Sequence, residues 1–197
     1  MEITTSMIKE LRDVTGAGVL DCREALEETG GDFENAIAYL REKGHAEAAK
    51  KSESAASEGR IEAYIHHGSQ VGVMIELNCE TDFVARTDDF ETLAHNLALH
   101  IAFAAPDYLT REDVPEDVIE EEERIYRNQA LEQDKPEDIV DRIVEGRMEK
   151  FYEQACLLEQ PFVKNEDKSI EDLLNEATTA FGELILLRRF QRYEVGS

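Results

Sequence analysis

The sequence has no tryptophan, few aromatic residues and few basic residues. Only 7% of its 197 residues are aromatic whereas 42% are hydrophobic, so we expect small aliphatic cores rather than one large core. With 21 Lys and Arg against 45 Asp and Glu, the formal net charge is −24. Nucleic acid is held by clustered Lys and Arg that neutralise phosphates, and a surface this acidic repels polyanions. Direct binding of nucleic acid is therefore not expected.

Long apolar runs and paired cysteines are also missing. The longest apolar run, residues 101–106, is far shorter than the roughly 20 residues of a membrane span. The first nine residues have neither the basic start nor the apolar stretch of a targeting signal. Cys22, Cys79 and Cys156 are odd in number and widely spaced, which is typical of free thiols in a reducing compartment. We expect a cytoplasmic protein that binds no membrane.

No motif for a cofactor or a metal is present. The glycines of residues 15–18 lie between two predicted helices rather than after a strand, so they indicate a turn and not a phosphate loop. The five histidines do not share a helix face or a strand face, which argues against a metal site. We predict no cofactor and no metal.

Residues 1–44 have the pattern of a three-helix bundle. Thr5 or Ser6 can cap a first helix, which stops at the glycines of residues 15–18. A second helix is expected over residues 19–29, and Asp32 can cap a third that ends before Gly44. A bundle this small has no room for a substrate cavity and fits a role in docking to a partner. Residues 45–58, rich in Ala, Lys, Ser and Glu, are expected to form a helical linker.

Residues 59–197 have the pattern of an α+β domain. Apolar residues alternate over 61–65 and 71–77 on either side of a Gly-containing turn, which predicts a β-hairpin. Helices are expected over 88–104 and 170–181, a helical hairpin over about 116–155, and a third strand over 184–193. We therefore predict a three-stranded antiparallel sheet with helices on one side. Its second face would be partly apolar and could associate with another copy.

The segment from Asn78 to Arg86 is the least ordinary part of the sequence. Polar residues lead directly to Phe83, which indicates that an aromatic side chain is presented on a connection between strand and helix. Since Phe is usually buried, the residues alone favour the alternative, in which Phe83 packs on its own core. Cys79 has two acidic neighbours, which raise the pKa of a thiol, so an inert thiol is favoured over a nucleophile.

Several of these segments closely resemble the translation elongation factor Ts family. They follow one another in the family's order along the whole chain: residues 8–12 with 15–18, 21–26, 78–85, 144–148 and 160–163. The resemblance implies a guanine-nucleotide exchange factor for the GTPase elongation factor Tu, with a UBA-like bundle that docks on the GTPase domain. The segment that matches Thr81, Asp82, Phe83 and Val84 would insert near the nucleotide and dislodge Mg²⁺. Phe83 would be the wedge, and Asp82 would make polar contacts with the partner.

Val19 and Leu20, beside the glycine turn, are the candidates for docking contacts of the bundle, with packing inside the bundle as the alternative. The chain resembles the short form of the family, with one composite copy of a core subdomain that longer members carry twice. We expect a homodimer to restore the missing copy, with His67 serving a second contact with the GTPase.

Two other classes of function stay open from the residues. A cysteine hydrolase would depend on Cys79. An adaptor would bind proteins through residues 1–44 alone and would not need Phe83. The arginines Arg188, Arg189 and Arg192 are expected to pair within this acidic chain rather than with a partner.

Overall fold

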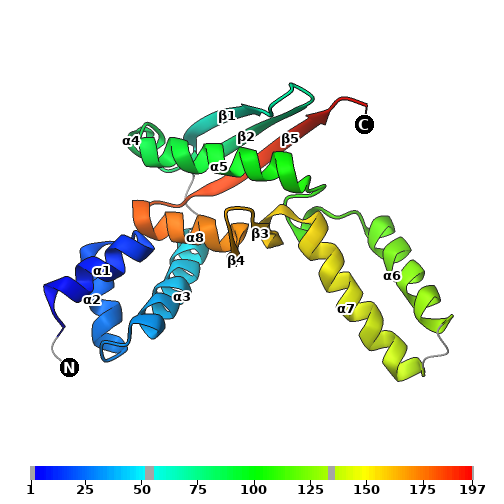
Figure 1. The fold of residues 1–197 in the computed structure, drawn as a ribbon, viewed down its shortest axis with the longest axis horizontal. Helices are drawn as coiled ribbons and strands as arrows, with labels where there is room; N and C mark the ends of the chain where they lie inside the picture. Colours follow the sequence, from blue (N-terminus) through cyan, green and yellow to red (C-terminus); the bar gives the residue numbers. More distant parts are fainter. Residues whose placement is uncertain (1–2, 52–55, 133–135, 197) are drawn as a thin grey trace. The chain divides into compact units, whose positions relative to one another are not determined.

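The computed structural model of the chain describes residues 3–51, 56–132 and 136–196, with the backbone alone for 45–51 and 137–138 (Figure 1). The fold is α+β, as predicted, with a three-stranded antiparallel sheet and a smaller two-stranded sheet among helices. Internal contacts divide the chain into two compact units, residues 1–99 with 171–197, and residues 100–170.

The first unit begins with the predicted three-helix bundle of α1 (Thr5–Thr15), α2 (Val19–Glu28) and α3 (Phe33–Lys51). The cap of α1 is Thr4 rather than Thr5 or Ser6, because the Thr4 hydroxyl accepts a hydrogen bond from the Met7 N–H at 3.3 Å. The helix ends at Gly16, whose φ of 70° is left-handed and favours glycine. A small aliphatic core holds the three helices: Leu11, Ala17, Cys22, Ala25, Leu26, Ala36 and Leu40.

Helix α3 is longer than predicted. It continues through Gly44 to Lys51, because residues 45–51 are mostly Ala, Lys and Glu, which favour helix. The predicted boundary at residue 44 thus lies inside a helix, and residues 52–55 of the predicted linker lie outside the described residues. The contacts also group the bundle with the sheet and set residues 100–170 apart, whereas the sequence suggested a single domain over 59–197.

The sheet consists of β1 (Glu58–Ile65), β2 (Val71–Cys79) and β5 (Leu186–Glu194), in the order β1-β2-β5. Helix α5 (Asp88–Ala104) lies along one face (Figure 1). Helix α8 (Ile170–Phe181) precedes β5, and the rings of Phe90 and Phe181 meet edge to face at 5.9 Å. The predicted last strand begins two residues late, at Leu186, since Leu184 and Ile185 still belong to the connection from α8.

Strand β1 turns its polar side chains toward α5. Arg60 pairs with Glu91 at 2.9 Å, and His95 lies 3.5 Å from Glu62. The alternating apolar residues of β1 therefore lie on the other face of the sheet. There they are exposed together with residues of β2 and β5: Ile61, Ala63, Ile65, Met74 and Tyr193. This open face of the sheet is partly apolar, as the sequence suggested.

The second unit contains the predicted helical hairpin, formed by α6 (Glu116–Leu131) and α7 (Glu137–Ala155). Its core consists of Ala130, Val140, Val144 and Met148. Two short 3₁₀ helices, η1 (Arg111–Asp113) and η2 (Leu157–Glu159), and a two-stranded sheet of β3 (Pro161–Phe162) and β4 (Asn165–Ser169) were not predicted. Across the described ranges of both units, no helix is long and apolar enough to span a membrane.

Candidate functional site

The segment that follows β2 folds into a single helical turn, α4 (Asp82–Ala85). Thr81 is its cap, with extended φ and ψ of −129° and 152°, and its hydroxyl accepts from the Val84 N–H at 3.5 Å. Ala85 is buried and anchors the turn, so the residue two positions earlier is directed outward. This local geometry decides the orientation of Phe83.

Phe83 is 82% exposed. The residues alone favour packing of Phe83 on its own core, and this expectation is wrong. The alternative, an aromatic ring presented on the surface, is what the structure has. Burying a phenylalanine side chain stabilises a fold by about 1.5–3 kcal/mol, and this fold forgoes that gain. An aromatic side chain held in solvent on a short rigid turn is available to a partner.

Asp82 and Arg86 form an exposed ion pair at 2.9 Å across the turn. Exposed pairs of this kind contribute little stability, about 0–1 kcal/mol, so Asp82 can exchange Arg86 for another partner at small cost.

A carboxylate from a distant part of the chain holds the residues just before α4. Glu183 lies in the connection between α8 and β5, and it accepts hydrogen bonds from the N–H groups of Glu80 and Thr81 at 3.1 and 3.0 Å. Its other oxygen accepts from the Thr81 hydroxyl at 2.6 Å. Sequence reasoning missed Glu183, because more than 100 positions separate it from Thr81.

Cys79 is an inert thiol in this arrangement. It is fully buried, and its S–H donates to the Thr81 carbonyl oxygen at 3.1 Å. Burial raises the pKa of this thiol, and the negative charge of Glu183 raises it further. A nucleophilic cysteine requires a lowered pKa and access to substrate, so the geometry does not support a hydrolase at Cys79.

The bundle presents a second apolar surface. Val19 and Leu20 begin α2 and are 53% and 78% exposed, so neither belongs to the core of the bundle. Val14, near the end of α1, is 64% exposed. The helical spacing of Ile8, Leu11 and Val14 predicts that all three share the inward-facing side of the first helix, and for Val14 this prediction is wrong.

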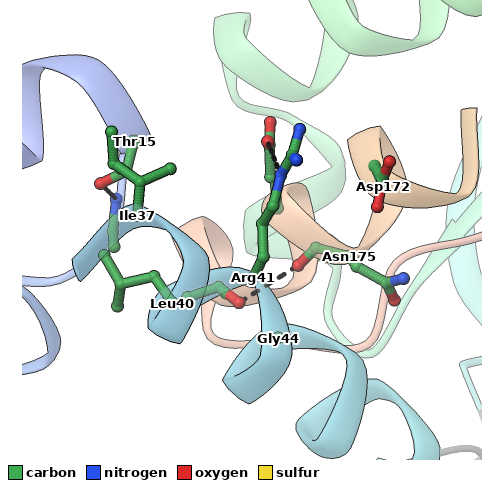
Figure 2. Close-up of a pocket in the computed structure, with 10 residues that line it drawn as sticks. Thr15, Ile37, Leu40, Arg41, Gly44, Asp172 and Asn175 are labelled. Atoms are coloured by element: carbon green, nitrogen blue, oxygen red, sulfur yellow. Dashed lines mark hydrogen bonds and ion pairs between the residues drawn. The ribbon is translucent and has the colours of Figure 1, made fainter. Parts of the chain in front are cut away.

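A narrow cleft lies between α3 and α8 (Figure 2). Arg41 of α3 reaches toward Glu176, with 3.8 Å between Nε and a carboxylate oxygen. Gly44 permits the close approach of the two helices, since a Cβ there would lie 2.8 Å from the Thr179 hydroxyl and 3.2 Å from the Asn175 carbonyl oxygen. The cleft therefore follows from helix packing, and we assign no ligand to it.

The remaining predicted contacts lie on the sheet and its turn. His67 is exposed at the turn between β1 and β2. Two of the three arginines of β5 form ion pairs at 2.7 Å, Arg189 with Glu76 and Arg192 with Glu194. No cluster of three or more metal-ligating side chains occurs within residues 3–51, 56–132 and 136–196.

Comparison with known proteins agrees with the resemblance noted in the sequence. The family model described as "Elongation factor TS" matches residues 2–197. Elongation factor Ts of Desulfitobacterium hafniense is 57% identical, over 99% of this chain and 90% of the relative. Elongation factor Ts of Moorella thermoacetica is 55% identical, over 98% and 96%, and that of Coprothermobacter proteolyticus is 55% identical over the full length of both. The chain belongs to the elongation factor Ts family.

Proposed function

We propose that this protein is a cytoplasmic guanine-nucleotide exchange factor, which binds elongation factor Tu in its GDP form and promotes release of GDP so that GTP can bind. The observation that carries the proposal is the exposure of Phe83 on a helical turn whose cap residue, Thr81, is held by the Glu183 carboxylate. Family membership supports the same role. No covalent step is required of the protein.

Phe83 is the wedge in this proposal. Its ring enters the partner near the nucleotide and displaces side chains that hold the metal and its waters. Mg²⁺ bridges phosphate oxygens and offsets their charge, so a shifted metal leaves the phosphates of GDP less compensated. By linkage, the factor weakens GDP binding to the same degree as GDP weakens binding of the factor.

The other residues of the turn support the wedge. Asp82 exchanges its exposed pair with Arg86 for polar contacts with the partner. Val84 adds apolar contact area beside the ring, and Thr81 fixes the start of the turn. On the bundle, Val19 and Leu20 supply an exposed apolar docking contact that adds affinity without touching the nucleotide.

We also propose that two copies associate through the open face of the sheet. The exposed apolar residues on this face are neighbours across the strands, with Ala63 paired to Met74 and Ile65 paired to Gly72 across β1 and β2. Gln191 and the ion pair of Glu76 with Arg189 lie beside them on the same face. A face of this kind in a soluble protein is typical of an interface between protein chains. In the dimer, His67 at the sheet's turn serves a second contact with the GTPase.

The test of the exchange role is release of a fluorescent GDP from elongation factor Tu, with the wild type and with Phe83→Ala. Loss of an aromatic anchor at an interface costs about 2 kcal/mol or more, so we expect acceleration by the wild type and a loss of about 30-fold in the variant. Phe103→Ala is the matched control, since Phe103 is likewise exposed but lies at the end of α5. It should retain wild-type activity.

An adaptor that binds through the bundle alone is the second candidate, favoured by the exposed Val19 and Leu20. It predicts no acceleration of GDP release by any variant, with binding retained in Phe83→Ala and lost in Leu20→Ala. The two functions are thus separated by the same set of proteins.

A further inference from the structure

We propose that Glu183 is the positioning residue of the turn that presents Phe83, and that its carboxylate sets the rate of exchange rather than the affinity for the GTPase. The inference rests on the proposed function. It assigns a role to a residue outside the segment of residues 81–84, on a different connection of the fold.

The carboxylate of Glu183 accepts three hydrogen bonds from two consecutive residues. One oxygen takes the N–H groups of Glu80 and Thr81 at 3.1 and 3.0 Å, and the other takes the Thr81 hydroxyl at 2.6 Å. Hydrogen bonds to an ionised carboxylate are stronger than neutral ones. Three of them fix the position of the backbone immediately before Asp82, the first residue of α4.

The connection between β2 and α4 and the connection between α8 and β5 each accept a hydrogen bond from the other. The Glu80 carboxylate accepts from the Leu184 N–H at 2.7 Å, while the Glu183 carboxylate accepts from the Glu80 N–H. Asn78 and Leu186 are partners in the β2–β5 ladder, so these bonds continue the attachment of the two strands beyond the sheet. The turn with Phe83 is thereby tied to the sheet at one end.

Without this attachment, the orientation of Phe83 is weakly held. The cap bond within the turn, from the Val84 N–H to the Thr81 hydroxyl, is long at 3.5 Å. The hydrophobic effect favours rotation of the exposed ring toward apolar surface of its own chain. Glu183 opposes that rotation by fixing Thr81, so Phe83 meets the partner already in its working orientation. A wedge that is already in place loses less conformational freedom when it enters.

The test is the dependence of GDP release on factor concentration for Glu183→Ala, Glu183→Gln and a matched control, Glu120→Ala, at an exposed site on α6. Misplacing a reacting group by about 1 Å costs up to about 100-fold, so we expect the maximal rate of Glu183→Ala to fall about tenfold or more. Docking surfaces such as Leu20 are unchanged, so the half-saturating concentration should stay near that of the wild type. Glu183→Gln keeps an acceptor and should recover part of the rate.

Amide hydrogen exchange gives a readout at the turn itself. In Glu183→Ala, the amides of Glu80 and Thr81 should exchange faster, whereas amides of the β1–β2 ladder should not change. If Glu183→Ala fails to fold, the comparison is made with Glu183→Gln, which should exchange these two amides faster and show an intermediate maximal rate.

The outcomes separate the two proposals. A wild type that does not accelerate GDP release overturns the exchange function and this inference with it. If the wild type is active, Phe83→Ala is inactive and Glu183→Ala keeps the full maximal rate, the positioning role of Glu183 alone is overturned. An effect of Glu183→Ala confined to the half-saturating concentration also overturns it, because it would assign Glu183 to affinity.

Discussion

The side chains with the most reactive groups, the three cysteines and His100, are buried in their uncharged forms. The three cysteines are buried, and burial raises the pKa of each thiol, for Cys156 to about 11. His100 is also buried, with Nε2 2.9 Å from the Gln160 side-chain oxygen and Nδ1 3.3 Å from the Val163 N–H. In the neutral ring, Nε2–H donates to the Gln160 oxygen and Nδ1 accepts from the Val163 N–H, so both ring nitrogens have a hydrogen-bond partner. Phe83 differs from these residues, because its side chain is exposed to solvent.

The cysteines should react slowly in the native protein. A rise of the Cys156 pKa from 9.0 to about 11 lowers its thiolate fraction about 100-fold at neutral pH, and burial restricts access as well. A disulfide reagent at pH 7 should label none of the three thiols quickly, and all three on addition of denaturant. Rapid labelling of Cys79 in the folded protein would contradict the assignment of an inert thiol.

His100 should make the stability of the protein sensitive to mild acid. Burial lowers the pKa of His100 in the folded state, so the unfolded chain binds the proton more tightly. The stabilisation is present above the ordinary pKa of about 6.5 and is lost as the pH falls below it. Denaturant unfolding at pH 7.5 and 5.5 should show a smaller pH dependence in His100→Gln than in the wild type. The exposed His67→Gln control should keep the wild-type dependence.

At the scale of helices and strands, the sequence predicts most elements but not how distant ones meet. Hydrophobic periodicity located α5, α8 and both helices of the hairpin, because long amphipathic patterns are strong signals. Alternation located β1 but could not decide which of its faces α5 covers. The polar face is covered, since Arg60 and Glu62 find partners on α5.

For the candidate site too, the sequence predicts the local residues but not the contact with a distant one. Thr81 to Val84 could be singled out from the sequence because turn-forming residues precede an aromatic one, and the resemblance gave them a role. The exposure of Phe83 could not be predicted, because it depends on a single helical turn whose start is held by Glu183 from another connection. Contacts between residues more than 100 positions apart leave no local pattern.

Two glycines in helices should respond to alanine in opposite directions. At Gly146 of α7 an added Cβ meets nothing within 4 Å, so Gly146→Ala should stabilise the protein by about 1 kcal/mol through helix propensity. At Gly44 the added Cβ would lie 2.8 Å from the Thr179 hydroxyl and 3.2 Å from the Asn175 carbonyl oxygen. Overpacking of this kind costs about 1–3 kcal/mol, which offsets or exceeds the same gain in helix propensity. Denaturant unfolding of Gly44→Ala and Gly146→Ala measures both, and equal stabilisation by the two substitutions would contradict the close packing of α3 on α8.

At the scale of the whole molecule, net charge and apolar surface act against one another in self-association. Each chain carries a net charge of −24, which repels a second copy, whereas the open face of the sheet exposes apolar side chains in the middle of its strands. Salt screens the repulsion over a Debye length of about 8 Å at physiological ionic strength and leaves the apolar attraction. The proposed dimer should therefore become tighter as salt is added.

Sedimentation equilibrium at micromolar concentration tests the dimer. We expect the wild type to be a dimer and Met74→Lys to be a monomer, because Met74 lies on the central strand of the open face. Lysine lowers the net negative charge, so loss of the dimer cannot result from added repulsion. A monomeric wild type with full exchange activity would refute the dimer and leave the role of Phe83 intact.

The central claim is that Phe83 releases GDP by disturbing the magnesium site of elongation factor Tu. The most direct measurement is the rate of GDP release with saturating wild type or saturating Phe83→Ala, each at millimolar Mg²⁺ and again in excess chelator. The wild type should be faster than the variant when Mg²⁺ is present, and the two rates should converge when the metal is removed, since the wedge then has no metal to displace. An advantage of the wild type that is as large in chelator as in Mg²⁺ would contradict the account.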